Sequence, residues 1–326
     1  MTRLAFTLHL FEPSNPTHRS TAAAIWSAAC SPDLAISPRF VEFNTRPSTG
    51  AVQLGQVAIQ DDQIVGFILA SAAPNAPEAA RPDHGWIDAI AVAPDAQRQG
   101  IGSALLDWGE IWLHTQHVTS AHLGGSLRPF TPGLPDELHN ENFFRARGYA
   151  GQHETWDVAR DLGDYTLTLP QAPKPAGGLP TTRPAQAEDE SALREFFVRE
   201  FPGRWRYEFE EHLREGGRLS DYTVLVSERG IDGFCFLTFE DSPRPLERFY
   251  MHRLPRPWGQ AGPLGVSADR RKLGYGLVVV DAGLRRLRDA GVRGCVIDWT
   301  GLLDFYGKFG FKPHRKYLML SKKLAD

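Results

Sequence analysis

Two glycine-rich segments are the parts of this sequence best suited to bind a charged ligand. One is Gln97-Arg98-Gln99-Gly100-Ile101-Gly102, and the other is Arg271-Lys272-Leu273-Gly274-Tyr275-Gly276. Each follows an apolar, strand-like run that ends at Val92 or Val266 and precedes a helix-like run. Free backbone N–H groups at the start of a helix carry partial positive charge and suit a pyrophosphate. The basic side chains Arg98, Arg271 and Lys272 would add charge-assisted hydrogen bonds.

Other phosphate-binding loops do not fit these two segments. A P-loop ends in Gly-Lys followed by Ser or Thr, and neither segment has that ending. A dinucleotide-binding loop needs a third glycine at a fixed spacing inside a βαβ unit, which is also missing. A single Gly-x-Gly is weak by itself, because it more often marks a tight turn before a helix.

The glycine-rich pattern is stronger evidence because it occurs twice in the sequence, with its residues at matching spacings. Val92 and Val266, and likewise Gly100 and Gly274, are 174 positions apart. A second motif follows in each half, Phe143-Phe144-Arg-Ala-Arg-Gly148-Tyr149 and Phe305-Tyr306-Gly-Lys-Phe-Gly310-Phe311. The sequence therefore predicts a tandem repeat of one domain. The first copy carries extra residues between its two motifs, and we assign them to the Pro/Gly-rich loop 128–135.

A Pro/Gly-rich segment separates the two copies. Residues 169–180 contain four prolines and two glycines, a composition that excludes a helix interior or a central strand. We therefore predict an N-terminal domain over residues 1–163, a linker over 164–181 and a C-terminal domain over 182–326.

The same order of elements is predicted in both domains. Early helices are expected at Thr21–Ala29 and Glu188–Glu200, and paired strands at Val57–Ala70 and Tyr222–Phe239. Then follow a buried strand, the glycine loop and its helix, a further strand (Ala121–Leu123 or Cys295–Trp299) and a short helix at the second motif. This order predicts a mixed α/β fold.

The amino-acid composition is that of an ordinary globular protein. The 326 residues have a net charge of −3 and no apolar run long enough to span a membrane, which requires about 18 residues. Cys30, Cys235 and Cys295 share no metal-ligand spacing. We expect a cytoplasmic protein without a metal, a nucleic-acid partner or a membrane partner.

Together these motifs resemble the GNAT acetyltransferase superfamily, and specifically its tandem-repeat members. The resemblance implies two twisted mixed sheets with helices on both faces. In each sheet, the fourth and fifth strands splay apart to admit the pantetheine arm of acetyl-CoA, the expected cosubstrate. It also implies that the following residues bind this cosubstrate: Ile90, Val92, Gln97, Arg98, Gln99, Gly100, Ile101, Gly102, Ser103, Leu264, Val266, Arg271, Lys272, Leu273, Gly274, Tyr275, Gly276 and Leu277.

The resemblance also implies that the two domains are not equivalent. In the family, a tyrosine of the second motif protonates the CoA thiolate, and Tyr306 occupies that position. A tyrosine stays protonated at neutral pH because its ordinary pKa is about 10. The first domain has Phe144 there, which has no proton to give. We therefore predict that the C-terminal domain is catalytic and the N-terminal domain degenerate.

The general base is less well defined by the sequence. Asp88 lies where family members often place a carboxylate, but its counterpart in the second domain is Gly262. Asp298 is the preferred candidate, with Glu240, His252 or a water molecule as alternatives. Arg204 and Trp205 fall in the segment that covers the acceptor site in the family, so we predict that they bind substrate together with Glu240. Trp205 would serve equally well as a core residue.

The predicted activity is transfer of an acetyl group from acetyl-CoA to a primary amine of a small molecule by direct attack. Two alternatives remain open: a non-catalytic acyl-CoA-binding protein, and an acetyltransferase of peptide or protein N-termini. The chain is expected to act as a monomer or a homodimer.

Overall fold

The computed structural model describes residues 6–166 and 180–324, and it divides into two compact units. Unit 1 comprises residues 1–156 and 315–326, and unit 2 comprises residues 157–314. This division differs from the predicted domain boundaries, because residues 157–163 belong to unit 2 and the last twelve residues of the chain belong to unit 1. Most of the predicted linker lies outside the described residues.

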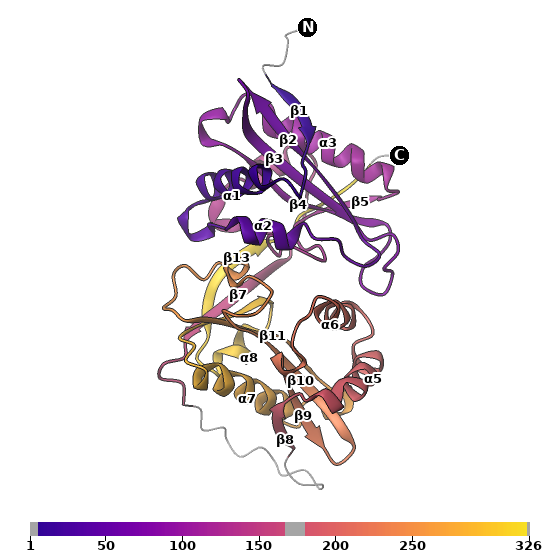
Figure 1. Ribbon diagram of the computed structural model, residues 1–326, viewed down its shortest axis with the longest axis vertical. Coiled ribbons are helices and arrows are strands. Elements are labelled where there is room, and N and C mark those ends of the chain that lie inside the picture. The colour runs from indigo at the N-terminus through magenta and orange to yellow at the C-terminus, as the bar shows by residue number, and fades with distance from the viewer. Residues whose placement is uncertain (1–5, 167–179, 325–326) are drawn as a thin grey trace. The chain divides into compact units, whose positions relative to one another are not determined.

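Unit 1 is built on a sheet in the strand order β1-β2-β3-β4-β5-β14. The long helix α3 packs on β3 and β4 from one face, and α1 packs on the other face (Figure 1). The strands are β1 (Thr7–Leu10), β2 (Val52–Gln60), β3 (Gln63–Ala72), β4 (His84–Val92), β5 (Ser120–Leu123) and β14 (Ser321–Lys323). The helices are α1 (Pro16–Cys30), α2 (Pro38–Asn44), α3 (Ile101–Thr115) and α4 (Glu141–Arg145).

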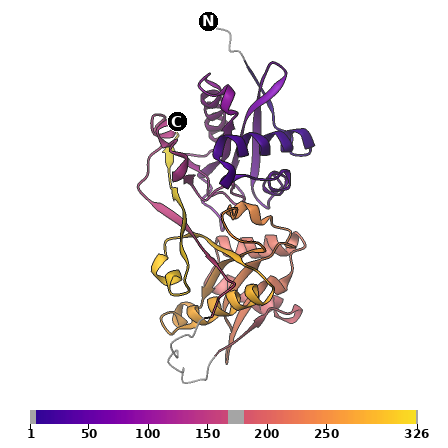
Figure 2. The same cartoon turned by 90° about the vertical axis from the view of Figure 1, so that its left-hand side faces the viewer.

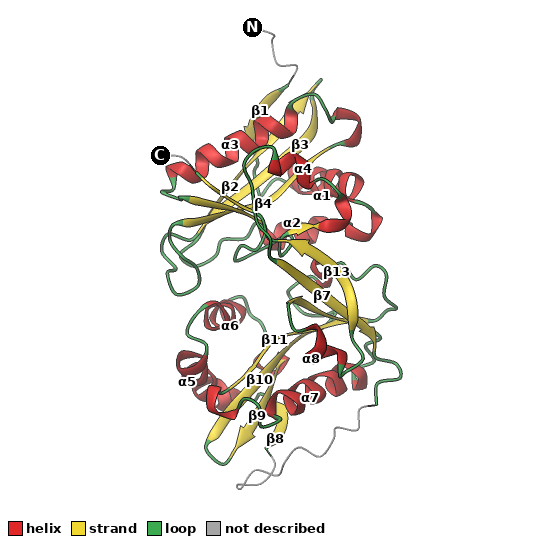
Figure 3. Cartoon of the chain, turned by 180° about the vertical axis from the view of Figure 1, so that it is seen from behind, coloured by secondary structure: helices red, strands yellow, loops and turns green. Residues whose placement is uncertain are grey.

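The strands of unit 2 belong to a sheet in the order β6-β13-β7-β12-β11-β10-β9-β8, of which β6, the start of β7 and the end of β13 are residues of unit 1. Figure 3 shows α7 and α8 on one side of this sheet and α5 and α6 on the other. The strands are β6 (Leu134–Pro135), β7 (Glu154–Asp161), β8 (Thr181–Pro184), β9 (Tyr222–Ser227), β10 (Gly230–Thr238), β11 (Trp258–Val266), β12 (Gly294–Thr300) and β13 (Lys312–Leu318). The helices are α5 (Glu190–Glu200), α6 (Arg204–Arg214), α7 (Tyr275–Asp289) and α8 (Leu303–Gly307).

The core of unit 2 follows the alternation of side chains along β10. Phe234 and Phe236 belong to an aromatic cluster with α5 and α6, whereas Cys235 and Leu237 pack on the α7 side. A glycine lets α7 approach the strand, since a Cβ at Gly283 would lie 2.8 Å from the Cys235 sulfur. Gly109 on α3 has the same role in unit 1, where a Cβ would lie 2.8 Å from Ile68. In both units, a glycine in the long helix thus allows the helix to pack closely on the sheet.

The mixed fold, the tandem repeat and the order of strands and helices agree with the sequence prediction. The sequence did not reveal the edge strands β1 and β8 or the strands that follow the second motif. These last strands are exchanged between the repeats. The C-terminal β14 pairs with β5 of unit 1, from Ser321 opposite His122 to Lys323 opposite Ser120 (Figure 2). In unit 2, β7 lies next to β12, although it precedes the predicted linker.

Candidate active site

The glycine loop of unit 2 connects β11 to α7 in a conformation that leaves the helix start open. Lys272 and Gly274 have φ values of 65° and 85°, both in the left-handed region. Gly274 is the N-cap of α7 and provides no capping side chain, so the first N–H groups of the helix face the loop. Gly276 faces α8, and a Cβ there would make an ordinary contact with the Phe305 ring at 3.6 Å. The loop therefore has the backbone features of an anion site.

A cavity opens next to this loop because two parallel strands separate. β11 and β12 pair only from Trp258 opposite Gly294 to Gln260 opposite Val296. Beyond that point β11 contains Gly262-Pro263, and proline cannot donate to a strand ladder. Residues 262–264 and 297–299 of the two strands then line opposite walls of a cavity of about 1050 Å³. The predicted splay between the fourth and fifth strands is present.

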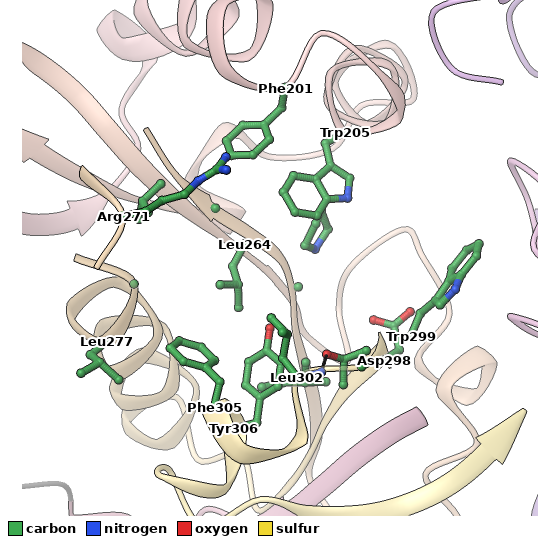
Figure 4. Close-up of a pocket in the computed structure, with 18 of the residues that line it drawn as sticks. Phe201, Trp205, Leu264, Arg271, Leu277, Asp298, Trp299, Leu302, Phe305 and Tyr306 are labelled. Carbon is green, nitrogen blue, oxygen red and sulfur yellow. Dashed lines mark hydrogen bonds between the residues drawn. The ribbon is translucent and has the colours of Figure 1, made fainter. Parts of the chain in front are cut away.

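The cavity has two chemically different ends (Figure 4). At one end, Arg271 and Leu277 lie beside the glycine loop and the start of α7. At the other end, Trp205 of α6 lies across from Asp298 and Trp299 of β12. Apolar side chains line the stretch between the two ends. This layout provides a charged end for phosphates, an apolar passage and a polar, aromatic end for a second substrate.

Tyr306 lines the cavity from α8. Its side chain is largely buried, and its ring makes an edge-on contact with Phe305 at 5.1 Å between centroids. Burial raises the pKa of the Tyr306 phenol well above its ordinary value, and the charges of Cys235 and Asp298 act in the same direction. The hydroxyl therefore keeps its proton throughout the physiological pH range.

Asp298 is held in place by a buried chain of hydrogen bonds. The Gln260 amide nitrogen donates to Asp298 Oδ1 at 2.8 Å and to the Gly262 carbonyl at 2.9 Å. The Gln260 carbonyl oxygen accepts from the Thr238 hydroxyl at 2.9 Å. Because Gln260 and Thr238 are both buried, the Asp298 carboxylate has a fixed orientation on the cavity wall.

Most of the site residues predicted for the second domain meet in this cavity. Arg204 and Trp205 stand on the first turn of α6, not in the connection before it. The predicted residues that line the cavity are Arg204, Trp205, Leu264, Val266, Arg271, Lys272, Gly274, Gly276, Leu277, Asp298 and Tyr306.

Three predicted residues do not line the cavity. Leu273 is exposed at the tip of the loop, and Tyr275 is buried in the core below it. Glu240 forms an ion pair with Arg256 at 3.3 Å, and its carboxylate accepts the Trp258 N–H at 3.1 Å. Local partners at the base of β11 thus contact the Glu240 carboxylate outside the cavity lining, and its assignment to the substrate site stays a prediction.

The sequence missed several lining residues that come from irregular segments. Arg244 and Arg248 lie between β10 and β11, a stretch for which no element was predicted. Phe201 precedes α6, and Trp299 lies at the end of β12. Trp299 has a φ of 51°, so the strand bends there. The sequence signal for them was a run of arginine and aromatic residues, which does not by itself indicate a cavity.

The corresponding loop of unit 1 has the same backbone conformation. Arg98 and Gly100 have φ values of 64° and 87°, and a Cβ at Gly102 would lie 3.7 Å from the Phe143 ring. Gln97 donates to the Val92 carbonyl at 3.0 Å, and Gln99 contacts Gln60 at 3.0 Å. The assignment of this loop to acetyl-CoA stays a prediction. It includes Ile90, Ile101 and Ser103, of which Ile101 is buried in the core.

The strand next to that loop differs from its counterpart. Asp88 is buried in β4 and accepts hydrogen bonds from the Ser71 hydroxyl at 2.8 Å and the Gln53 amide at 2.7 Å. Burial raises the pKa of the Asp88 carboxyl to about 6, against hydrogen bonds from Ser126, Gln53 and Ser71 that lower it. A smaller cavity of about 270 Å³ lies beside these partners.

Residues 19–126 match the model of the acetyltransferase (GNAT) family. These residues of the chain therefore form a domain of the GNAT acetyltransferase family. The matched region contains the first glycine loop and ends before Phe144, so it does not include the position of the proposed acid. The GNAT family uses acetyl-CoA as its cosubstrate, and the chain is an N-acetyltransferase.

Several known proteins resemble this GNAT chain over most of its length. Mycothiol acetyltransferase of Nocardia farcinica is 25% identical over 250 residues, which cover 71% of this chain and 72% of that one. A GCN5-related glucosamine N-acetyltransferase region of a fungal multi-domain GH3 β-N-acetylglucosaminidase has a TM-score of 0.86 at 22% identity. The match covers 98% of this chain and spans 38% of the longer fungal chain.

A tandem GNAT protein from the clavulanic acid biosynthesis pathway has a TM-score of 0.70 at 14% identity, and the match covers 98% of this chain and 99% of that one. These neighbours establish the tandem GNAT fold. Within the described residues, no helix has the length and apolar character needed to cross a membrane.

Proposed function

We propose that unit 2 transfers an acetyl group from acetyl-CoA to a primary amine of a small molecule, by direct attack of the amine on the thioester. The observation that carries this proposal is the single cavity that joins the glycine loop, Asp298 and Tyr306. In this proposal the phosphates of acetyl-CoA bind at the loop, with Arg271 and Lys272 beside them. The pantetheine arm runs between β11 and β12 toward Tyr306.

The reaction needs three proton transfers, and the cavity has a group for two of them. Asp298 accepts a proton from the acceptor ammonium, directly or through water, which frees the lone pair of the amine. The amine then attacks the thioester carbon, the carbon–sulfur bond breaks, and the nitrogen releases its second proton to water as the amide forms. Tyr306 donates its proton to the departing thiolate, and bulk water restores the proton. An acid with a raised pKa is always in the protonated form that this step requires.

An acetyl-cysteine intermediate does not fit this site. Cys235 and Cys295 are buried in the core of unit 2, and neither lines the cavity. Burial raises the pKa of the Cys235 thiol to about 12, which suppresses the thiolate that a nucleophile needs. Direct attack is the route that the cavity residues favour.

A small acceptor is favoured by two observations. The acceptor end is walled by Trp205 and Trp299, so the space for the second substrate lies between aromatic side chains. The fungal neighbour is described as a glucosamine N-acetyltransferase region, and glucosamine is a small primary amine. In this proposal unit 1 has no turnover of its own, because Phe144 replaces the acid, and it retains a loop able to bind CoA.

The test is a screen of primary amines with acetyl-CoA in which release of the CoA thiol is followed, with peptides that have free N-termini in a second arm. Acetylation of a small amine that is lost in Tyr306→Phe supports the proposal. Acetylation of peptides alone would favour the N-terminal acetyltransferase alternative. Tight CoA binding without turnover of any amine would favour the binding-protein alternative.

A further inference from the structure

Three arginines gather at the acceptor end of the cavity in unit 2. Arg204 comes from the first turn of α6, and Arg244 and Arg248 come from the segment between β10 and β11. Glu208 and Asp298 are the acidic residues among the lining side chains. The end that must admit an amine is therefore not simply acidic, although an amine in its ammonium form is a cation.

Arg204 already has a partner for its charge. Its guanidinium forms an ion pair with Glu208 at 2.8 Å and lies over the Trp299 ring, 4.7 Å from the centroid. This pair is formed within one helix, four residues apart. We therefore regard Arg204 as part of the wall that positions Trp299.

Arg244 and Arg248 are in a different situation. Both guanidinium groups lie against the Phe249 ring, 4.9 Å and 5.2 Å from its centroid. Within residues 6–166 and 180–324, neither forms an ion pair with a carboxylate, and the buried Nε of Arg244 has no hydrogen-bond partner. Two buried or half-buried cations beside each other are costly without a counter-ion.

The pKa of Arg248 is consistent with a position at the acceptor end of the cavity, close to Arg244, Asp298 and Glu208. Burial, together with the neighbouring positive charge of Arg244, lowers the pKa of Arg248 to about 9, whereas the charges of Asp298 and Glu208 act to raise it. Arg248 therefore remains charged at neutral pH. Its interaction with Asp298 also places Arg248 at the acceptor end, away from Arg271 and Lys272 at the glycine loop.

We propose that the acceptor of unit 2 carries a carboxylate or a phosphate in addition to its amine, and that Arg244 and Arg248 bind this anion. Guanidinium groups match both anions with paired, charge-assisted hydrogen bonds. With the anion fixed there, the amine of the same molecule faces Asp298 and the thioester. The inference rests on the proposed function, since it names the substrate class of the same cavity.

The experiment uses pairs of amines that differ only in the anion, with the full chain saturated with CoA. The probes are glucosamine and glucosamine 6-phosphate for the phosphate arm, and phenethylamine and phenylalanine for the carboxylate arm. Binding is measured by calorimetry, and turnover of the same pairs is measured with acetyl-CoA. The variants are Arg244→Gln and Arg248→Gln. Arg206→Gln is the matched control, because Arg206 lies on α6, pairs with Glu210 at 2.9 Å and does not line the cavity.

In at least one arm, we expect the anionic member to bind roughly 10- to 100-fold more tightly than its neutral partner, as for a charge-assisted hydrogen bond. Arg244→Gln and Arg248→Gln should remove this difference, leave the neutral member unaffected and keep CoA affinity intact. Arg206→Gln should keep the difference. The arm that shows the difference identifies the anion.

Equal binding of the two members in both arms, or a difference that survives both variants, would overturn the inference. Turnover of neutral amines with no preference for an anion would refute the anion site and leave the proposed acetyltransferase activity standing. Preferential binding of an anionic amine without its acetylation would support the anion site and contradict the proposed acetyltransferase activity. Loss of CoA binding in a variant would indicate misfolding, and the remaining arginine variant then decides.

Discussion

The two units have glycine loops with nearly the same backbone, but their surroundings differ at the positions closest to the reacting atoms. The φ values of Arg98 and Lys272 differ by one degree, and those of Gly100 and Gly274 by two. Next to the loops, unit 1 has the buried carboxylate Asp88 where unit 2 has Gly262, and Phe144 where unit 2 has Tyr306.

This comparison distinguishes what phosphate binding requires, which is a backbone conformation, from what proton transfer requires, which is particular side chains. A loop that presents backbone N–H groups to phosphates depends on backbone angles, and both copies maintain those angles. Proton transfer depends on particular side chains, and here the two copies have diverged. A Gly-Pro pair opens β11 beside the cavity, whereas the same place in β4 is filled by Asp88, which accepts hydrogen bonds from Gln53 and Ser71. Four experiments would break or sharpen this contrast.

The largest effect is expected from Tyr306→Phe. The change removes the hydroxyl of the proposed acid and little volume, so kcat should fall by about 10²–10⁴ while CoA affinity stays nearly constant. Steady-state kinetics and the CoA dissociation constant are the measurements. Tyr149→Phe is the matched control, because it removes a buried hydroxyl that lies in unit 1 just after the short helix α4. An unchanged kcat in Tyr306→Phe would remove this residue from the mechanism.

The next effect concerns the two loops. In Gly274→Asp, a side chain at a φ of 85° and a negative charge both oppose phosphate binding, so CoA affinity of unit 2 should fall by about 100-fold or more. Gly100→Asp should reduce turnover much less. Gly216→Asp is the control, since Gly216 has a φ of 79° and open space around its Cβ position, outside the cavity. Equal losses of kcat/KM in the two loop variants would contradict the proposed division of roles.

A smaller effect is expected in the pH profile of turnover. Because the pKa of Tyr306 is raised, the acid stays protonated at pH values where an ordinary tyrosine, with a pKa of about 10, is half ionised. The wild-type kcat should therefore show no decline up to about pH 10. Thiol release is followed with correction for uncatalysed thioester hydrolysis. A decline that is present in the wild type and absent in Tyr306→Phe would show that the phenol ionises in this range.

The smallest effect concerns stability and belongs to unit 1 alone. The Asp88 carboxyl has a pKa of about 6 in the folded chain against 3.8 as its reference value. Between these values the folded protein holds a proton that the unfolded chain releases, so this residue makes stability fall as pH rises. Relative to Asp88→Asn, the free energy of unfolding should drop by about 3 kcal/mol at most between pH 4 and pH 7. Denaturant unfolding of both proteins across this range is the test, and parallel curves would contradict it.

The repeated, local part of the fold was predictable from the sequence. The strand, glycine loop and helix could be placed because their signals are local: an apolar run, glycines at fixed spacing and a second apolar run. The β2–β3 and β9–β10 hairpins were predicted as the paired strands at Val57–Ala70 and Tyr222–Phe239, and both hairpins are present. The edge strands β1 and β8 are four residues each and mostly not buried, so they lack the apolar alternation that marks a strand.

The cavity residues that belong to the repeated motifs could be predicted from the sequence. Those that come from the loops between the motifs could not. Tyr306 and the loop residues 271–277 could be found by register alone. Arg244 and Arg248 could not, because the segment between β10 and β11 has no counterpart in the repeat motifs and no periodic pattern. The place of Glu240 outside the cavity lining was not predictable for a related reason. Its position after a strand was visible in the sequence, whereas its pairing with Arg256 and the Trp258 backbone was not.

The exchanged last strands have a consequence for how the chain is made. Unit 1 needs residues 321–323 for its β14 strand, and these are translated only after the whole of unit 2. Until then, β5 is an edge with unpaired backbone groups. N-terminal domains usually fold first during synthesis, but here the first unit is finished only after the second has been translated in full. A nascent chain stalled before residue 315 should therefore leave β5 open to proteolysis or to a chaperone.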